Sequence, residues 1–463
     1  MLIVKYKNPL NQIIKGDKLK IHTVGGYSEV GKNMTVLELE DDAFIFDEGF
    51  FLPAIVGLNE RDKDEFTYTE KRLRDIKAIP DDHLIEKIRH KVIAQFVGHA
   101  HLDHVGAIPF LSDRYNAPIY GTPFTCAVLD TLLRDNEIVL KNKVIPIHPN
   151  NSFFIQGKKQ KYLVDFINIT HSTIQTTFIA IHTKQGVVLY ANDFKLDDSP
   201  ILGAPPNYRR LKEIAKKGVH ALIVDSLYAG SDRKTPSEKI ARNLLEEVLL
   251  TIQNRNAGII VTTFSSHIAR LKSIVEFGKK LNREIVFLGR SLNKYTKAAQ
   301  DVKLAPFLKD VRVSSYRRQV EKTLSRVNKN RRNYMIVCTG HQGETGSILE
   351  RMSRNQLPFK INKEDNIVFS SSVIPTPVNQ EGFAKMESRL RKSRARIFRD
   401  VHVSGHAGRE DLRDLLNLLK PHHVIPAHGG LDKTKPMIAL CTEMGYKFNK
   451  QSHLMTDGGV LKI

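Results

Sequence analysis

The sequence predicts an α/β protein of more than one domain. Its 463 residues exceed the size of one ordinary domain and suit two or three. Short apolar runs typical of buried strands alternate with helix-like stretches along most of the chain. Several of these runs end directly in His or Asp. The strand ends are therefore where a functional site is expected.

The first half of the chain is expected to be rich in strands. Strands are predicted at residues 20–24, 34–39, 43–46, 92–97, 119–120, 164–169, 178–183, 187–191 and 219–224, and a helix at 124–134. A glycine-rich segment, 25–33, separates the first two strands. Because a strand follows this segment, it is expected to form a hairpin-like turn and not a phosphate-binding loop.

A second α/β unit is predicted from about residue 237. Helices are expected at 238–255 and 266–281, and strands at 258–263, 285–288 and 334–338. Such an alternation is typical of a largely parallel sheet. Because the last third of the chain returns to strand ends bearing His, this unit is interpreted as an inserted domain.

The composition is strongly basic, with 71 Lys and Arg residues against 50 Asp and Glu residues and a formal net charge of +21. This surplus favours a polyanionic partner, nucleic acid before a membrane surface. Basic residues crowd two spans, 312–332 and 385–399, without interleaved aromatic residues of the kind that stack on bases. Contact with a phosphate backbone is therefore expected, and sequence-specific reading is not.

The three cysteines indicate a reducing compartment. Cys126, Cys338 and Cys441 are widely separated and match no Cys-x-x-Cys spacing, which argues against a disulfide framework or a thiolate metal site. The apolar start of the chain, residues 1–4, is too short for a signal peptide, and no run of 18 apolar residues exists. A cytoplasmic protein without a membrane partner is expected.

Residues 92–106 carry the strongest signal in the sequence. An apolar run is followed there by His99, His101, Asp103 and His104. In an extended backbone His99 and His101 point to the same side, since they are two positions apart. A lone His at a strand end is usually structural. Three imidazoles and a carboxylate, however, are typical of a first-row metal site, with zinc as the default ion.

Three further ligand-type residues follow other apolar runs, namely His171, Asp193 and His428. With the His-rich motif they predict two metal positions that share Asp193 as a bridging carboxylate. The first position is expected to use His99, His101 and His171. The second is expected to use Asp103, His104 and His428. Two ions about 3.5–4 Å apart clamp and activate a water between them.

The segment 397–406 adds polar residues. His402, Ser404 and His406 occupy alternate positions, so they face one way if a strand persists there. His406 is placed to act as an acid or as a phosphate ligand. Asp225, which follows an apolar run, repeats the pattern of an acidic residue at a strand end.

Together these motifs resemble the RNase J family, in the β-CASP branch of the metallo-β-lactamase superfamily. The metal motif of the superfamily is similar to His99-Ala-His101-Leu-Asp103-His104 with Asp47, His171 and Asp193. The surroundings of Asp225, His406 and His428 resemble three further β-CASP motifs. Residues 338–344, Cys-Thr-Gly-His-Gln-Gly-Glu, resemble a loop of RNase J in particular, as does the segment 25–33. Because little chain follows His428, the sequence looks like the archaeal form.

The resemblance implies an αββα metallo-β-lactamase fold interrupted by an α/β β-CASP domain. The boundaries expected are 1–236 and 386–463 for the two parts of the metallo-β-lactamase domain and 237–385 for the β-CASP domain. The resemblance also implies a homodimer with two Zn²⁺ ions per subunit, or Mn²⁺ in their place. The activity implied is 5′-to-3′ exoribonuclease on single-stranded RNA that carries a 5′-monophosphate, often with endonuclease cuts in addition.

Roles for individual residues follow from this reading. Asp103, Asp193 and His406 are the expected catalytic residues; Asp103 would receive the proton of the water, and His406 would stabilise or protonate the leaving oxygen. The residues expected to hold a terminal phosphate are His402, Ser404, Gly405, His406, Ser370, Ser371 and Ser372. Asp225 is expected to orient a neighbouring ligand, and Asp47 to tie loops together beneath the metals.

Two alternatives stay open. One is a β-CASP endoribonuclease for RNA 3′-end processing, which would cut a circular RNA. The other is a catalytically inactive RNA-binding subunit, although an inactive copy is expected to lose one of the seven ligands. The loops 172–177 and 370–380 depart from the family pattern, the second at Thr376-Pro377 and Gln380.

Overall fold

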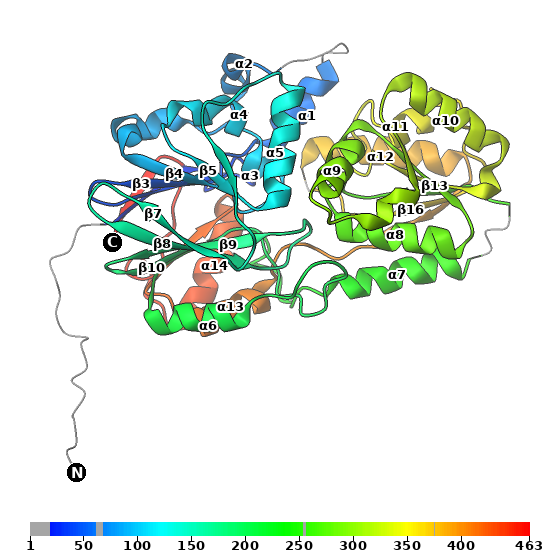
Figure 1. Ribbon diagram of the computed structural model, residues 1–463. Coiled ribbons are helices and arrows are strands. Elements are labelled where there is room, and N and C mark those ends of the chain that lie inside the picture. Colours follow the sequence, from blue (N-terminus) through cyan, green and yellow to red (C-terminus); the bar gives the residue numbers. More distant parts are fainter. Residues whose placement is uncertain (1–18, 62–67, 253–255, 375) are drawn as a thin grey trace.

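The computed structural model describes residues 19–61, 68–252, 256–374 and 376–463 (Figure 1). Three features named above lie outside these ranges: the apolar start of the chain, the predicted helix end at Arg255, and Pro375.

A seven-stranded sheet forms one layer of the first domain, in the order β19-β1-β2-β3-β4-β5-β6. The strands are β1 (Lys20–Gly25), β2 (Met34–Glu38), β3 (Ala43–Phe46), β4 (Val92–Phe96), β5 (Ile119–Gly121), β6 (Val144–Pro146) and β19 (Gly459–Lys462). Pairing is antiparallel from β19 to β3 and parallel from β3 to β6. The segment 25–33 joins the antiparallel strands β1 and β2, which confirms the predicted hairpin-like turn.

A six-stranded sheet forms the second layer, in the order β18-β11-β10-β9-β8-β7. The strands are β7 (Ser152–Gln156), β8 (Lys161–Asn168), β9 (Thr177–Thr183), β10 (Gly186–Ala191), β11 (Val219–Asp225) and β18 (His423–Ala427). β10, β11 and β18 run parallel, whereas β7 to β10 alternate in direction.

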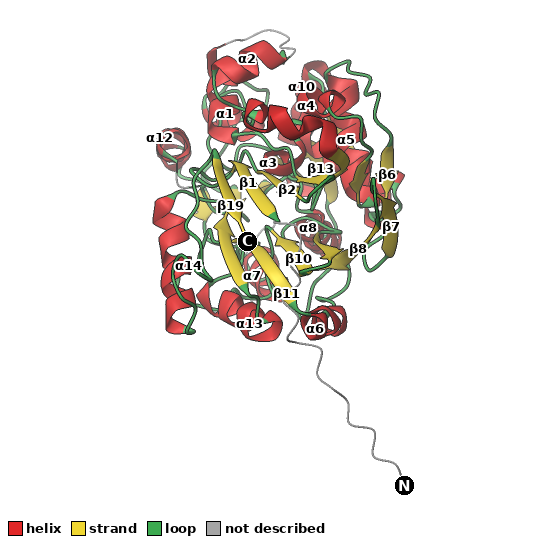
Figure 2. Cartoon of the chain, turned by 90° about the vertical axis from the view of Figure 1, so that its left-hand side faces the viewer, coloured by secondary structure: helices red, strands yellow, loops and turns green. Residues whose placement is uncertain are grey.

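The two sheets pack face to face between two layers of helices (Figure 2). Phe96 of the first sheet and Phe166 of the second meet in this core, with ring centroids 6.1 Å apart. The outer face of the second sheet packs on α6 (Tyr208–Lys217), α13 (Arg409–Leu419) and α14 (Leu431–Glu443). The helices on the side of the first sheet are α1 (Leu52–Arg61), α2 (Glu70–Asp75), α3 (Leu102–Val105), α4 (Ile108–Leu111), α5 (Pro123–Asp135) and the 3₁₀ helix Asp82–Lys91. This layering confirms the predicted αββα fold.

The third sheet belongs to the insert, and its six strands are all parallel, as predicted. They are β12 (Ile259–Thr262), β13 (Glu284–Leu288), β14 (Val311–Ser314), β15 (Tyr334–Cys338), β16 (Asn366–Phe369) and β17 (Arg396–Phe398). Hydrophobic residues of β12 and β15 pack on both faces, which is typical of a parallel sheet covered by helices. The helices are α7 (Glu238–Leu250), α8 (Ile268–Lys280), α9 (Arg290–Asp301), α10 (Arg317–Lys329), α11 (Ile348–Ser353) and α12 (Pro377–Lys392).

The insert packs directly against the sandwich. One hydrophobic core contains Val128 and Leu132 of α5 together with Leu292 and Tyr295 of α9. In Figure 1, α5 and α9 accordingly lie side by side where the two domains meet. The contact brings the loops of the insert close to the strand ends of the first domain.

Candidate metal centre and phosphate pocket

The predicted ligand-type residues gather at one edge of the sandwich, where several strands end. Four of them follow the carboxyl end of a strand, namely His99 after β4, His171 after β8, Asp193 after β10 and His428 after β18. Asp103 and His104 lie on α3, whose N-cap residue is His101. The sheets thus bring together residues that are far apart in the sequence.

Three buried residues of this edge have a left-handed backbone. The φ angles are 59° at Asp47, 44° at Asp193 and 59° at His428. Residues other than glycine rarely adopt this conformation, and such strain concentrates at functional sites. The sharp turn after each strand directs the side chain toward the other polar groups of the edge.

The first cluster contains His99, His101, His171 and Asp193, whose nearest nitrogen and oxygen atoms lie within 4.8 Å of one another. His101 Nδ1 is 3.1 Å from His99 Nε2 and 3.1 Å from His171 Nε2. Asp193 Oδ2 is 3.3 Å from His99 Nε2 and 3.5 Å from His171 Nε2. These residues are the ones predicted for the first metal position and its bridge.

The second cluster contains Asp103, His104, His428 and again Asp193. His104 Nε2 is 3.2 Å from Asp193 Oδ2 and 3.7 Å from Asp103 Oδ2. His428 Nδ1 is 3.5 Å from Asp193 Oδ1, and its Nε2 is 3.9 Å from Asp103 Oδ2. Asp193 therefore lies between the two clusters, where a bridging carboxylate was expected.

Hydrogen bonds on the remote ring nitrogens orient three of the imidazoles. The pairs are His104 Nδ1 with Asp47 Oδ2 at 2.7 Å, His171 Nδ1 with the Gly405 carbonyl at 2.7 Å, and His101 Nε2 with Ser266 Oγ at 3.0 Å. Because the carboxylate and the carbonyl only accept, Nδ1 carries the proton in His104 and His171. The Nε2 atom of His171 then presents a lone pair to the clusters, as metal-binding histidines do. Burial lowers the pKa of His104, but Asp193, Asp103 and Asp47 outweigh it and raise that pKa well above the ordinary value, so His104 must release the Nε2 proton when metal binds.

This arrangement fits divalent metal ions. Asp193 is fully buried, and its Oδ1 accepts no hydrogen bond from the residues that the structure describes. A buried carboxylate is costly unless it is paired or coordinates a cation. Nitrogen ligands about 2.05 Å from a tetrahedral zinc ion lie about 3.3 Å apart. The two distances of 3.1 Å around His101 Nδ1 are close to that value.

The electrostatics of the clusters favour ligation. Burial and then the neighbouring imidazoles hold the pKa values of His101 and His171 well below the ordinary range, so both rings are neutral. Burial opposes ionisation of Asp193, but His428, His104 and the other imidazoles outweigh it and keep the pKa of this carboxyl well below its usual value. Neutral imidazoles and an ionised carboxylate are the forms that bind metal.

His406 and Asp225 form a third group with Asp193. His406 Nδ1 is 2.8 Å from Asp225 Oδ2, and its Nε2 is 3.9 Å from Asp193 Oδ2. Burial lowers the pKa of His406, but the two carboxylates outweigh this effect and raise it to about 9. In this environment the ring is a cation at neutral pH, and its Nε2–H faces the clusters.

Several predicted phosphate-binding residues lie in two parts of the chain, the loop after β16 and the segment that returns from the insert after β17. His402 and Ser370 share a contact residue, the buried Arg270. Ser371 is buried, and its hydroxyl has no hydrogen-bond partner in the described part of the chain. Ser372 is exposed. We call these four residues the candidate phosphate pocket.

Ser404 and Gly405 connect this pocket to the clusters. Ser404 Oγ accepts the backbone N–H of His406 at 3.0 Å, and Gly405 approaches Ser172 so closely that a Cβ would lie 2.7 Å from the Ser172 Cβ. The strand considered for 397–406 does not persist, because β17 ends at Phe398 and the chain then crosses between domains. Burial nevertheless alternates as expected, because Val401, Val403 and Gly405 are buried whereas His402, Ser404 and His406 are partly exposed.

Three residues of the site were not predicted, namely Asn33, Ser266 and Arg270. Asn33 Nδ2 lies 3.2 Å from His104 Nε2 and 2.9 Å from His428 Nδ1. A signal for Asn33 was present, since it ends the glycine-rich segment already singled out. Ser266 and Arg270 lie in the segment 266–281, which was predicted only as a helix, so the sequence gave no such signal for them.

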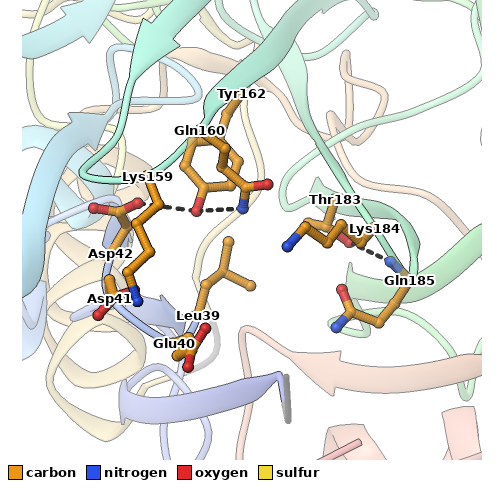
Figure 3. A pocket seen from close by; sticks show the side chains of 10 residues that line it. All are labelled: Leu39, Glu40, Asp41, Asp42, Lys159, Gln160, Tyr162, Thr183, Lys184 and Gln185. Atoms are coloured by element: carbon orange, nitrogen blue, oxygen red, sulfur yellow. Dashed lines mark hydrogen bonds and ion pairs between the residues drawn. The ribbon is translucent and has the colours of Figure 1, made fainter. Parts of the chain in front are cut away.

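A separate cavity of about 220 Å³ lies at the opposite edge of the sandwich (Figure 3). Turns that precede β3, β8 and β10 line it, whereas the ligand-type residues follow these strands. Its walls include Asp42, Tyr162 and Lys184. Within the described residues, no metal-type cluster includes any of its lining side chains. The cavity is therefore separate from the candidate metal centre.

Models of three families match the chain. Residues 28–224 match the metallo-beta-lactamase superfamily, residues 256–387 the beta-CASP domain of ribonuclease J, and residues 392–450 a Zn-dependent metallo-hydrolase RNA specificity domain. Together with the αββα sandwich and its His/Asp clusters, these matches define a metallo-β-lactamase-type hydrolase that carries a β-CASP insert.

Curated relatives narrow this class. Ribonuclease J of Methanocaldococcus jannaschii is 40% identical over 96% of this chain and 99% of its own length. Ribonuclease J of Pyrococcus abyssi is 39% identical over 96% and 97%. Ribonuclease J of Helicobacter pylori is 28% identical over 99% of this chain but 63% of its own length. The chain belongs to the ribonuclease J family, and the similarity to its archaeal members confirms the resemblance drawn from the motifs.

A solved structure shares the fold. The crystal structure of a protein of unknown function from Enterococcus faecalis V583 superposes with a TM-score of 0.64 at 16% identity, over 96% of this chain and 100% of the other. None of the helices in the described ranges is long and apolar enough to cross a membrane.

Proposed function

We propose that this ribonuclease J family member removes nucleotides from the 5′ end of single-stranded RNA and prefers a 5′-monophosphate. One observation carries the proposal: the candidate phosphate pocket and the metal-type clusters are joined by the short segment 402–406. The four Cα–Cα steps from residue 402 to residue 406 span at most about 14 Å. A terminal phosphate at His402 and a cleavable phosphate beside His406 would then be near neighbours along one RNA chain, as exonuclease action requires.

Two Zn²⁺ ions are proposed to occupy the clusters, with Mn²⁺ as the alternative. The buried Asp193 carboxylate and the converging imidazole nitrogens support this assignment. His99, His101 and His171 would hold one ion. Asp103, His104 and His428 would hold the other, and Asp193 would contact both. When bound, the ions neutralise charge on the reacting phosphate and make the attacking water more acidic.

The protein side chains are proposed to handle the protons. Asp103 can accept the proton of the attacking water, since its carboxylate lies at the second cluster with 15% of its side chain exposed. His406 can donate from Nε2 to the leaving oxygen, because its Nδ1 is engaged by Asp225. Asp225 and Asp47 each hold a histidine in place through one hydrogen bond.

The RNA strand is proposed to follow the carboxyl edge of the insert sheet toward α10. Ser314, Leu288, Cys338 and Thr262 are in register across four neighbouring strands, so Ser314 lies about 14 Å from Thr262. Ser266, four residues after Thr262, contacts His101. The start of α10 and the metal centre are therefore on the same edge of the sheet.

The exposed side of α10 is suited to a phosphate backbone. Arg318, Lys322, Arg326 and Lys329 are exposed on one side of the helix and form no ion pair with other described residues; we call them the α10 basic stripe. Tyr316, at the helix N-cap, is 69% exposed. Tyr316 lies within the basic span 312–332, and its exposed ring can stack on a base. The prediction that this span lacks such an aromatic residue was therefore wrong.

An endonuclease is the second candidate, and the environment of Ser370 favours it. Ser370 is fully buried, its hydroxyl donates to the Val401 carbonyl at 2.8 Å, and it accepts from Arg270. A hydroxyl engaged in this way has less capacity for a terminal phosphate. By contrast, the complete set of seven ligand-type residues argues against an inactive RNA-binding subunit.

Degradation of one RNA with a 5′-monophosphate, a 5′-triphosphate or a 5′-hydroxyl tests the proposal. Mononucleotides should appear fastest from the monophosphate form, and His101→Ala should abolish the reaction, since it removes a central ligand. A circular copy of the same RNA should survive. Internal fragments from the circle and from all three linear forms would instead establish the endonuclease.

Three further expectations complete the proposal and rest on the family. The first is a homodimer, which light scattering in solution can test. The second is a cytoplasmic location, which fits an RNA substrate. The third is the domain division 1–236, 237–385 and 386–463. For the domain division, limited proteolysis is expected to release a stable fragment that begins near residue 237 and ends near 398, because α12 continues to Lys392 and β17 pairs with β16 of the insert.

A further inference from the structure

We propose that Arg270 is a positioning residue that sets selectivity for the RNA 5′ end by holding His402 and Ser370 in place. The inference rests on the proposed 5′-phosphate pocket and names the side chain that builds it. Arg270 lies in the first turn of α8 and is fully buried. It touches no predicted metal ligand in the contacts of the described residues.

One side of the Arg270 guanidinium is fixed by a carboxylate. Its Nε donates to Glu238 Oε1 at 2.5 Å and its Nη2 donates to Glu238 Oε2 at 2.8 Å. Glu238 is 4% exposed, so this is a buried bidentate ion pair. Such a pair holds the planar group in one orientation, which a lysine cannot reproduce.

The remaining nitrogen, Nη1, points at the candidate phosphate pocket. It lies 2.9 Å from the Ser370 carbonyl, 2.8 Å from Ser370 Oγ and 3.3 Å from His402 Nδ1. The Val401 carbonyl is a fourth neighbour at 3.4 Å. One guanidinium thus contacts both parts of the chain that supply the pocket, the loop after β16 and the segment returning from the insert.

The contact with His402 also fixes the proton on that ring. Arginine has only donors, so His402 Nδ1 must accept and its proton must reside on Nε2. Burial and then the charge of Arg270 lower the pKa of His402 to about 2, so the ring is neutral. Arg270 therefore leaves His402 with its N–H donor at Nε2, on the side of the ring away from the guanidinium, and an N–H donor is the group that a phosphate oxygen needs.

The same ion pair ties the pocket to the first domain. Glu238 is the first residue of α7, where the chain enters the insert, and its backbone N–H donates to Asp197 Oδ2 at 2.7 Å. Asp197 follows Asp193 by four residues. Arg270 thus links both crossings between the domains, and its loss should misplace the pocket relative to the metal centre.

The test measures kcat/KM of the metal-loaded, full-length protein on RNAs that differ only in a 5′-monophosphate or a 5′-hydroxyl. The ratio of the two values reports 5′-end selectivity and cancels general losses of activity. Arg270→Lys should lower the ratio about 10–100-fold, the range for a lost hydrogen bond to a charged group. Arg283→Lys is the matched control, because Arg283 is a buried arginine of the insert that bonds the Ala257 and Tyr334 carbonyls instead.

A double-mutant cycle separates positioning from general destabilisation. If Arg270 acts through His402, Arg270→Lys should lower the ratio no further in a His402→Ala background. Glu238→Gln keeps Arg270 but weakens the ion pair that holds it, so a selectivity ratio between those of the wild type and Arg270→Lys is expected. This variant replaces Arg270→Lys in the test if Arg270→Lys does not fold.

Two results would overturn the inference. A folded Arg270→Lys or Glu238→Gln protein with the wild-type ratio would exclude the positioning role. A wild-type ratio near one would remove the selectivity itself, and the proposed 5′-monophosphate preference would fail with it. The first result leaves the proposed preference intact, so the two failures are distinguishable.

Discussion

Asp47 shows how much a single side chain beneath the clusters can organise. Its carboxylate accepts the Gly98 N–H at 2.8 Å, His104 Nδ1–H at 2.7 Å and the Tyr190 hydroxyl at 2.6 Å. These donors come from the loop after β4, from α3 and from β10. One residue therefore fixes three segments of the site, which supports its predicted role of tying loops together.

Asp47→Ala should weaken metal binding or hydrolysis about 10–100-fold, as removal of such outer partners of metal-binding histidines typically does. The variant frees His104 to rotate and leaves two buried donors, the Gly98 N–H and the Tyr190 hydroxyl, without their acceptor. Metal content after dialysis against a weak chelator, measured with RNA hydrolysis, checks this expectation. Asp42→Ala is the matched control, because Asp42 is equally buried but bonds Tyr162 and Lys158 at the opposite edge. Full metal content together with wild-type hydrolysis in Asp47→Ala would refute the role.

At the residue scale, the sequence predicted the candidate metal ligands, because these are recognised by residue type and by their position at a strand end. All seven predicted ligands lie in the two clusters, because ligand-type residues at strand ends converge on one edge. Their functional roles stay predictions. Ser266 could not be found in this way, because its contact with His101 depends on how the insert packs against the sandwich. Sequence spacing carries no information about that contact.

At the scale of secondary-structure elements, both basic spans contain cations that pair with acidic side chains, and in the span 312–332 these include Arg312, Arg317 and Arg331. The difference is that the remaining cations of this span include the four of the α10 basic stripe, on one side of a helix. In the span 385–399 several cations pair with acidic side chains, namely Lys385 with Glu381, Arg389 with Glu350, and Arg391 and Arg399 with Glu387. The α10 basic stripe has no such partners among the described residues. Charge that is already neutralised attracts RNA weakly, so the stripe is the better candidate.

Replacing Arg318, Lys322 and Arg326 with Gln should weaken binding of single-stranded RNA and reduce its salt dependence. Each lost phosphate contact lowers the slope of log K against log salt by about 0.7, so three contacts amount to about 2. Binding is measured in a His101→Ala background to prevent cleavage. The matched control replaces Lys385, Arg391 and Arg399 with Gln, for which little change is expected. Equal slopes in both triple variants would reject the stripe as the RNA track.

Element boundaries were predicted well where apolar periodicity was strong. The strand expected at 187–191 corresponds to β10 (Gly186–Ala191), and that at 334–338 to β15 (Tyr334–Cys338). The interpretation of 397–406 as a strand was wrong beyond Phe398. Alternating residues there satisfy a strand pattern, but the crossing between two domains has no neighbouring strand with which to pair.

At the scale of the whole molecule, the metal clusters join the two sheets of the sandwich at one edge. The clusters take side chains from the ends of strands in both sheets, and His428 comes from beyond the insert. Because binding to the folded state alone shifts the unfolding equilibrium, bound metal should stabilise the entire sandwich.

Chelation should therefore lower the Tm of the protein as well as abolish hydrolysis, and added Zn²⁺ or Mn²⁺ should restore both. The shift should shrink as the pH falls below neutral, since the histidine ligands must be unprotonated to bind metal. Differential scanning calorimetry with and without a chelator provides the measurement, and Asp193→Asn serves as the comparison with a weakened bridge. A Tm that does not respond to chelation would show that the clusters hold no stabilising ion.

Whole-molecule features were the least accessible from the sequence. The αββα class was implied by the resemblance of the motifs to a known family, and the parallel sheet of the insert was predicted from the alternation of strands and helices; the structure confirms both. The approach of α9 to α5, and with it the placement of Arg270, depends on packing between side chains such as Leu132 and Leu292. No local pattern encodes such a pairing.

The order of the ligand-type residues along the chain has a consequence for synthesis of the protein. Six of the seven lie at or before Asp193, whereas His428 follows the whole insert. His428 comes directly after β18, which pairs with β11 at the edge of the second sheet. The second cluster and the edge of the second sheet are therefore completed only after the ribosome has passed the insert.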